Sequence, residues 1–220
     1  MKLQGMTINF LGDSITEGSG ASCTENRYTD VFARTYGVKV NNYGIGGTRI
    51  ARQVKPTVPR HDLDFCLRME EMDESADAVV VFGGTNDFGH GDAPFGTPQD
   101  RDPSTFYGAC HYLMRGLVER YCGKPVVILT PLHRLGEDSP AGDGGGLRNP
   151  ESTEVLADYR RVIMEVAAYY ALPVLDLYAV SGMQPAIPAV QEKLMPDGLH
   201  PNDAGHAILA ARIGGFLSAL

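Results

Sequence analysis

Residues 78–87 read Ala-Val-Val-Val-Phe-Gly-Gly-Thr-Asn-Asp, five apolar residues followed by two glycines and three polar residues. The apolar run, Ala78–Phe82, has no polar alternation, which predicts a strand buried on both faces. The glycines after it permit a tight turn and a close approach of the backbone to a ligand. A buried strand that ends in such a turn is typical of a parallel sheet, in which ligands bind at the carboxyl ends of the strands.

The same alternation of short apolar runs and longer amphipathic stretches continues on both sides of this segment. Further strands are predicted at Met6–Leu11, Val38–Tyr43, Val126–Leu129 and Val174–Leu177. Helices are predicted at Tyr28–Tyr36, Asp62–Glu71, Ser104–Tyr121 and Thr153–Tyr170, with a last helix capped by Asn202. Strands and helices that alternate in this way predict one α/β domain over residues 1–220, a five-stranded parallel sheet with helices on both faces. Long surface loops are expected at Gly89–Pro103 and at Gly136–Pro150, which contains three consecutive glycines.

The composition excludes several classes of partner. The chain has 220 residues and a formal net charge of -8. An acidic surface repels phosphate backbones, so nucleic acid is not expected as a partner. No apolar run approaches the roughly 20 residues that span a bilayer, and Met6–Leu11 is too short for a signal peptide.

The four cysteines are widely spaced and form no Cys-x-x-Cys pair; they are Cys23, Cys66, Cys110 and Cys122. This spacing favours free thiols, mostly buried, over a zinc or redox site. Free thiols persist in reducing compartments. We therefore expect a cytoplasmic protein.

The first candidate for chemistry is Ser14, in the sequence Gly12-Asp13-Ser14 directly after the first predicted strand. A serine at the turn from strand to helix is placed where backbone N–H groups can face an anion. A helix-capping serine is the simpler interpretation of the same pattern. A phosphate-binding loop lacks support because no Gly-Lys-Ser/Thr and no Gly-x-Gly-x-x-Gly is present. The Gly-x-Ser-x-Gly elbow of the α/β-hydrolases is also absent.

The second candidate is the segment Asp197-Gly198-Leu199-His200-Pro201, which precedes the last helix. Histidine is the side chain best suited to accept a serine proton at neutral pH. Asp197, three positions earlier, can bind the other imidazole nitrogen and fix its tautomer. Two alternatives stay open, a simple turn before a capped helix and a metal site that would add Asp203 and His206.

Two glycine-rich turns also follow predicted strands. Gly47 lies in the turn after the second strand and can offer a backbone N–H to a ligand. Asn86 lies after the third and can offer its side-chain amide. Each turn alone is ordinary, but all four segments are predicted to meet at the carboxyl edge of one sheet.

Taken together, these four segments resemble the signature blocks of the SGNH hydrolases, also called the GDSL family of esterases and lipases. Gly12-Asp13-Ser14 resembles the nucleophile block, Gly47 the glycine block, Asn86 the asparagine block, and Asp197-Gly198-Leu199-His200 the Asp-x-x-His block. They stand in the order of the family and span nearly the whole chain.

The resemblance implies a flavodoxin-like three-layer α/β/α fold with five parallel strands. It also implies an ester hydrolase with Ser14 as nucleophile, His200 as base and Asp197 as its orienting partner. The backbone N–H groups of Ser14 and Gly47 and the Asn86 amide would form the oxyanion hole. No cofactor and no metal ion are expected.

The substrate is expected to be a small ester with a short acyl group, such as acetyl on a carbohydrate, because no apolar run is long enough to form a lipase lid. Residues that adjoin the blocks or the strand ends are candidates for contact with the substrate: Asp13, Asp87, Phe88, His133, Arg134, Met195 and Leu199. For His133 and Arg134, the alternative is that they are solvated loop residues. The residues favour neither a monomer nor a homo-oligomer.

Three other functions stay open. A thioesterase or lysophospholipase would use the same residues on longer acyl chains. A non-catalytic carbohydrate-binding protein would keep the fold, although the intact Ser14, Asn86, Asp197 and His200 disfavour it. A nucleotide-binding module lacks a phosphate-loop lysine.

Overall fold

The computed structural model describes residues 1–143 and 148–220. Within them, five strands form one all-parallel sheet in the order β2-β1-β3-β4-β5. The strands are β1 (Thr7–Gly12), β2 (Lys39–Gly44), β3 (Ala78–Phe82), β4 (Val126–Leu129) and β5 (Val174–Leu175). This order is that of flavodoxin-like sheets, so the predicted fold class is confirmed.

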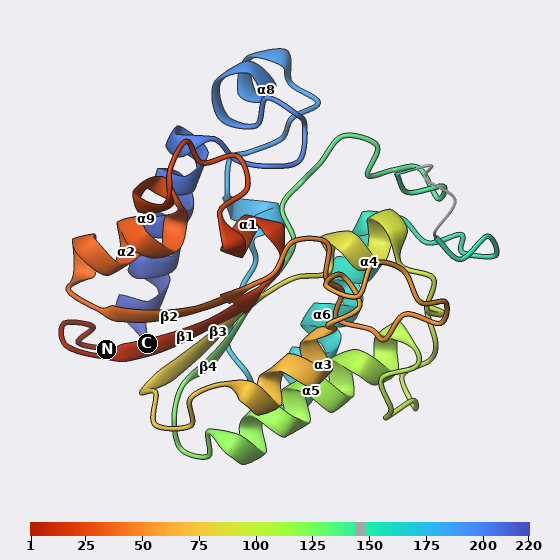
Figure 1. The fold of residues 1–220 in the computed structure, drawn as a ribbon, viewed down its shortest axis with the longest axis horizontal. Coiled ribbons are helices and arrows are strands. Elements are labelled where there is room, and N and C mark those ends of the chain that lie inside the picture. The colour runs from red at the N-terminus through yellow and green to blue at the C-terminus, as the bar shows by residue number, and fades with distance from the viewer. Residues whose placement is uncertain (144–147) are drawn as a thin grey trace.

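Helices cover both faces of the sheet (Figure 1). On one face α2 (Tyr28–Tyr36) packs beside α9 (Asp203–Ala219), and on the other lie α3 (Phe65–Arg68), α5 (Phe106–Arg120) and α6 (Leu156–Tyr169). The shorter helices, which lie mainly toward the carboxyl edge of the sheet, are α1 (Ser14–Glu17), α4 (Thr85–His90), α7 (Leu177–Val180) and α8 (Pro188–Leu194). Two 3₁₀ turns, Thr24–Asn26 and Met69–Glu71, complete the described helical segments.

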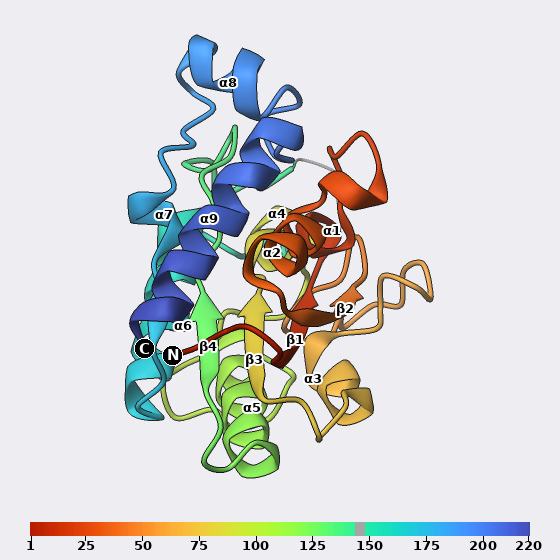
Figure 2. The same ribbon diagram turned by 90° about the vertical axis from the view of Figure 1, so that its left-hand side faces the viewer.

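Strand β3 shows why the sheet is buried on both faces. Its alternate side chains divide between two apolar clusters, because successive residues of a strand point to opposite faces. Val79 and Val81 join the cluster under α5 and α6, whereas Val80 and Phe82 join the cluster under α2 and α9. All five residues of the strand are buried. Figure 2 looks onto the face of the sheet, with α9 and α2 in front of it and α5 and α6 behind it.

Several predicted boundaries need correction. The helix expected at Asp62–Glu71 is α3 followed by a 3₁₀ turn, because the Asp64 carboxylate accepts the Leu67 N–H and caps a helix that begins at Phe65. The strand expected at Val174–Leu177 ends at Leu175, because the Asp176 carboxylate turns to the Thr130 hydroxyl and α7 begins at Leu177.

Two other predicted segments also start elsewhere. The helix expected from Thr153 begins at Leu156, where the Asp158 carboxylate accepts the Val155 N–H. The turn expected after β3 is already the first part of α4. Of the loop expected at Gly136–Pro150, residues 144–147 lie outside the described residues.

The cysteines partly match the prediction. All four are free thiols, but only Cys66 and Cys110 are buried, whereas Cys23 and Cys122 are exposed. Along the described part of the chain, the helices are too short or too polar to cross a bilayer.

Candidate active site

Ser14 and His200 are 186 positions apart in the sequence, and the fold brings them into contact. Ser14 is the first residue of α1, directly after β1, and its Oγ lies 2.9 Å from His200 Nε2. His200 lies in the segment that leads into α9. The Ser14 residue keeps only 9% of its surface exposed, whereas the His200 side chain keeps 22%.

Asp197 fixes the tautomer of His200. Its Oδ2 lies 2.7 Å from His200 Nδ1, and a carboxylate can only accept, so Nδ1 carries the proton. Nε2 is then left as an acceptor for the Ser14 hydroxyl. Asp197 Oδ1 also accepts the backbone N–H groups of Leu199 and His200. Partial burial by itself raises the pKa of Asp197, but the hydrogen bonds from His200 and Leu199 outweigh it and hold the pKa below its usual value.

A glycine turn lies beside Ser14. A β-carbon at Gly46 would stand 3.6 Å from the Ser14 β-carbon. At the next residue, Gly47, φ is +76°, and a β-carbon there would stand 2.7 Å from the His61 ring. Only glycine therefore fits this position. Among the described residues, neither the Gly47 N–H nor the Ser14 N–H has a hydrogen-bond partner, so both are available to a ligand.

Asn86 reaches the same turn from α4. The side chain is buried, and its Nδ2 donates to the Thr48 carbonyl oxygen over 2.9 Å. An amide nitrogen carries two hydrogens, so one remains for a ligand. The structure thus brings together the predicted Ser14, Gly47, Asn86, Asp197 and His200.

Arg68, which the sequence analysis missed, joins the two strands that carry these turns. Its guanidinium donates to the Gly12 carbonyl at the end of β1, to the Tyr43 carbonyl in β2 and to the Thr48 hydroxyl. It is 4% exposed and packs over the Phe65 ring. The sequence contains one sign of this role, since Arg68 lies on the apolar face of the predicted helix Asp62–Glu71. A charged side chain in such a position is rarely buried without partners.

Asp13 and Asp87 were expected to contact the substrate, but both are buried and accept hydrogen bonds from backbone N–H groups. Asp13 accepts the Ile15 N–H at the start of α1, and Asp87 accepts the N–H groups of Ile50 and Ala51. Burial raises the pKa of each carboxyl to about 6, although these N–H groups and nearby arginines act in the opposite direction.

Of the remaining residues expected to contact the substrate, some are buried and others are half-buried. Phe88 and Met195 are fully buried, and Phe88 packs against Tyr159. Arg134 is buried too, paired with Asp143 and donating to Thr85. His133 and Leu199 are half-buried. His133 Nδ1 lies 2.8 Å from the Glu137 carboxylate, and its ring packs on Tyr178.

The alternative metal set separates in space. Asp203 accepts from Ser22 and Asn26, and His206 is buried against Tyr28, with Nδ1 accepting the Tyr28 N–H. In residues 1–143 and 148–220 no group of three or more metal-ligating side chains converges.

The comparisons with known proteins are consistent with this geometry. The model of the GDSL-like lipase/acylhydrolase family matches residues 10–208. A protein from Lactobacillus plantarum of known structure is 31% identical with a TM-score of 0.82, over 99% of this chain and 98% of that one. The search of curated proteins found no match.

Two more distant structures share the fold. A carbohydrate acetylesterase family member from Sinorhizobium meliloti is 18% identical with a TM-score of 0.65, over 97% of this chain and 98% of that one. A two-domain esterase active on acetylated mannans is 22% identical with a TM-score of 0.61, over 97% of this chain and 48% of that one.

Proposed function

Since this chain belongs to the GDSL-like lipase/acylhydrolase family and is an ester hydrolase, we propose that it removes short acyl groups, such as acetyl, from a carbohydrate, with Ser14 as nucleophile. The observation that carries the mechanism is the line of contacts from Ser14 Oγ through the His200 ring to Asp197 Oδ2. These contacts support the proposal because a nucleophile, a base and an orienting group act in this order in serine hydrolases.

The first half of the reaction forms an acyl-enzyme. His200 Nε2 takes the Ser14 proton while Ser14 Oγ bonds to the ester carbonyl carbon, which becomes tetrahedral. Asp197 stabilises the imidazolium that results. The tetrahedral centre then collapses, and the bond to the alcohol oxygen breaks as His200 returns its proton to that oxygen.

The second half repeats these steps with water. His200 takes a proton from water, the hydroxide oxygen bonds to the acyl carbon, and the bond to Ser14 Oγ breaks as the serine is reprotonated. Both halves pass through a negatively charged oxygen. In this proposal, the N–H groups of Ser14 and Gly47 and the second amide hydrogen of Asn86 donate to this oxygen.

The exposure of the site supports an acyl group on a bulky alcohol. The Asp197 side chain is 55% exposed and the His200 side chain 22%, so this side of Ser14 opens to solvent. An open side suits an alcohol portion as large as a carbohydrate. The structural likeness to a carbohydrate acetylesterase family member and to an esterase active on acetylated mannans points the same way.

Hydrolysis of a series of p-nitrophenyl esters, from acetate to dodecanoate, tests this proposal. We expect the wild type to prefer acetate and Ser14→Ala to lose nearly all activity above the residual level supplied by binding and the oxyanion hole. Acetylated mannan and acetylated xylan then serve as substrates for acetate release. Wild-type activity in Ser14→Ala would contradict the mechanism, and a preference for long chains would favour a thioesterase or lysophospholipase.

Asn86→Ala tests the oxyanion hole separately. Loss of one oxyanion donor lowers kcat by a factor of about 10²–10³. Because Asn86 also donates to Thr48, the thermal midpoint of the variant is measured alongside its kinetics. An Asn86→Ala enzyme with wild-type kcat would remove this residue from the oxyanion hole.

A further inference from the structure

A second acidic residue lies on the nucleophile helix and contacts the glycine turn. Glu17 is three positions after Ser14, so both lie on the same side of α1. Glu17 Oε2 accepts the Gly46 N–H over 2.7 Å. The helix that carries the nucleophile therefore also holds the turn that carries the Gly47 N–H.

The geometry of this turn makes its anchoring important. The Thr48 N–H donates to the Ile45 carbonyl, which closes a four-residue β-turn with Gly47 in the third position. A positive φ at that position is characteristic of a type II turn, and a type I turn has the opposite orientation of the central peptide. A turn with glycine at both central positions can adopt either form at low cost. A flip of the central peptide would turn the Gly47 N–H away from its present direction.

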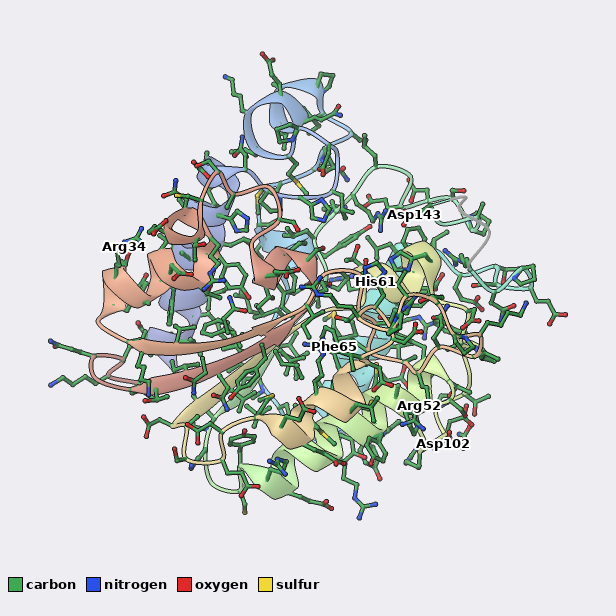
Figure 3. The ribbon with its side chains drawn as sticks, viewed as in Figure 1. Arg34, Arg52, His61, Phe65, Asp102 and Asp143 are labelled. Atoms are coloured by element: carbon green, nitrogen blue, oxygen red, sulfur yellow. The ribbon has the colours of Figure 1, made fainter. Side chains whose placement is uncertain are left out.

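Arg60 and His61 are neighbours of this anchored turn. The Arg60 guanidinium donates to Glu17 Oε1, and the His61 ring lies against Gly47. His61 is itself held by its backbone, since its N–H donates to Val58 and its carbonyl accepts from Arg49. Figure 3 labels His61, which overlaps α4 in this view.

The negative charge of Glu17 disfavours an oxyanion nearby, and the positive charge of Arg60 offsets this effect. A carboxylate near a developing oxyanion opposes the negative charge that the oxyanion hole must stabilise. Glu17 is only partly exposed, and Arg60 places a positive charge directly on it. The pair therefore provides a hydrogen-bond acceptor for Gly46 with little net charge.

We propose that Glu17 is a positioning residue that holds the Gly46–Gly47 turn so that the Gly47 N–H faces the oxyanion, and that Arg60 neutralises the charge of Glu17. This inference rests on the proposed function. Glu17 acts through the turn and does not touch the substrate.

Four variants test it with p-nitrophenyl acetate: Glu17→Ala, Glu17→Gln, Arg60→Ala and the double variant Glu17→Gln/Arg60→Ala. Glu17→Ala loses the acceptor, so we expect kcat to fall about 10- to 100-fold, the range of a misplaced group or a weakened oxyanion donor, with KM changed less than about twofold. Glu17→Gln keeps an acceptor oxygen, so kcat should return to within about threefold of wild type.

Arg60→Ala leaves the carboxylate unpaired, and we expect kcat to fall about three- to fivefold, as for a partly exposed ion pair. In the Glu17→Gln background the same change should have almost no effect, because no charge remains to be neutralised. This difference between backgrounds does not arise from a general loss of stability.

The matched control is Arg115→Ala, which removes a partner from the exposed pair Arg115–Glu119 on α5 and should leave kcat unchanged. An equal effect of Arg60→Ala in both backgrounds would overturn the inference, as would wild-type kcat in a folded Glu17→Ala. If Glu17→Ala fails to fold, the comparison of the two Arg60→Ala backgrounds still decides. A wild type without esterase activity would instead contradict the proposed function itself.

Discussion

At the residue scale, two glycines with nearly the same positive φ have different surroundings. Gly47 has φ +76° and Gly123 has φ +81°. A β-carbon at Gly47 would stand 2.7 Å from the His61 ring, whereas one at Gly123 would meet nothing within 4 Å. Both replacements strain the backbone, but only one displaces the turn beside Ser14.

We therefore expect Gly47→Ala to lower kcat about 10²-fold, as for a misplaced oxyanion donor. Gly123→Ala should lower the thermal midpoint, because it also strains the backbone, without changing kcat. Esterase kinetics and thermal unfolding of both variants provide the comparison. A Gly47→Ala enzyme with the kcat of Gly123→Ala would show that the Gly47 N–H plays no part.

Asp197 allows a second test at this scale. Asp197→Asn can still accept the N–H groups of Leu199 and His200 through its remaining oxygen, but it loses the charge that stabilises the imidazolium. We expect kcat to fall, by less than in Ser14→Ala. Steady-state kinetics across pH 5–9 measure this, and a wild-type rate would exclude Asp197 from the mechanism.

The sequence predicted candidate reacting residues but not those that hold them. Each of the turns that carry Ser14, Asn86 and His200 is ordinary alone, but these residues stand out because the segments are predicted to meet at one edge of the sheet. Arg68 and Glu17 act on backbone atoms that are near only in the fold, namely the carbonyls of Gly12 and Tyr43 and the Gly46 N–H. Sequence spacing carries no information about such partners.

At the element scale, α9 begins at Asp203, shortly after the Asp197–His200 segment. Asn202 caps it, since its side-chain oxygen accepts the N–H groups of Ala204 and Gly205. Its amide nitrogen donates to the Lys193 carbonyl in α8, so one side chain joins two helices across the segment that carries His200.

We expect Asn202→Ala to lower the free energy of unfolding by about 0.5–2 kcal/mol, the usual range for a lost N-cap. Asn202→Asp keeps the cap and loses only the bond to Lys193, so its loss should be smaller. Urea denaturation at pH 7 measures both. Equal losses would mean that the bond to α8, and not the cap, stabilises this junction.

Elements with strong periodicity were predicted better than short ones. The α2 boundaries, Tyr28–Tyr36, agree with the prediction because Gly37 ends the helix in the left-handed conformation. The strand expected at Val174–Leu177 has only two residues, because Asp176 is drawn to Arg160 and Thr130 on neighbouring elements. Side-chain contacts of this kind override local preference at the ends of elements.

At the scale of the whole molecule, the buried Asp87 links stability to pH. Burial raises the pKa of its carboxyl from 3.8 to about 6, although the N–H groups of Ala51 and Ile50 lower it. The unfolded chain therefore loses this proton at lower pH than the folded chain. The stability that protonation contributes is present below pH 4 and is lost as pH rises from 4 through 6.

Asp87→Asn lacks this titration. We expect the free energy of unfolding of the variant, relative to wild type, to rise between pH 4 and 6 by at most about 3 kcal/mol. Asp176→Asn is the control with the opposite sign, because the bond from Arg160 lowers the pKa of Asp176 and its contribution is lost as pH falls. Urea denaturation of all three proteins from pH 2.5 to pH 7 measures both slopes, since the contribution of Asp176 is lost below about pH 4, and parallel curves for Asp87→Asn and wild type would contradict the linkage.

The sequence by itself determined the five strands, the longer helices between them and the residue types that end the strands, because these features depend on local hydrophobic patterns and on turn chemistry. The tertiary structure alone decided which of the polar residues near the strand ends meet. Ser14 and His200 converge across 186 positions, whereas Asp87, Phe88 and Met195, equally near the blocks, turn into the interior. The physical reason is that burial and long-range hydrogen bonds depend on how the helices pack on the sheet, which no local pattern specifies.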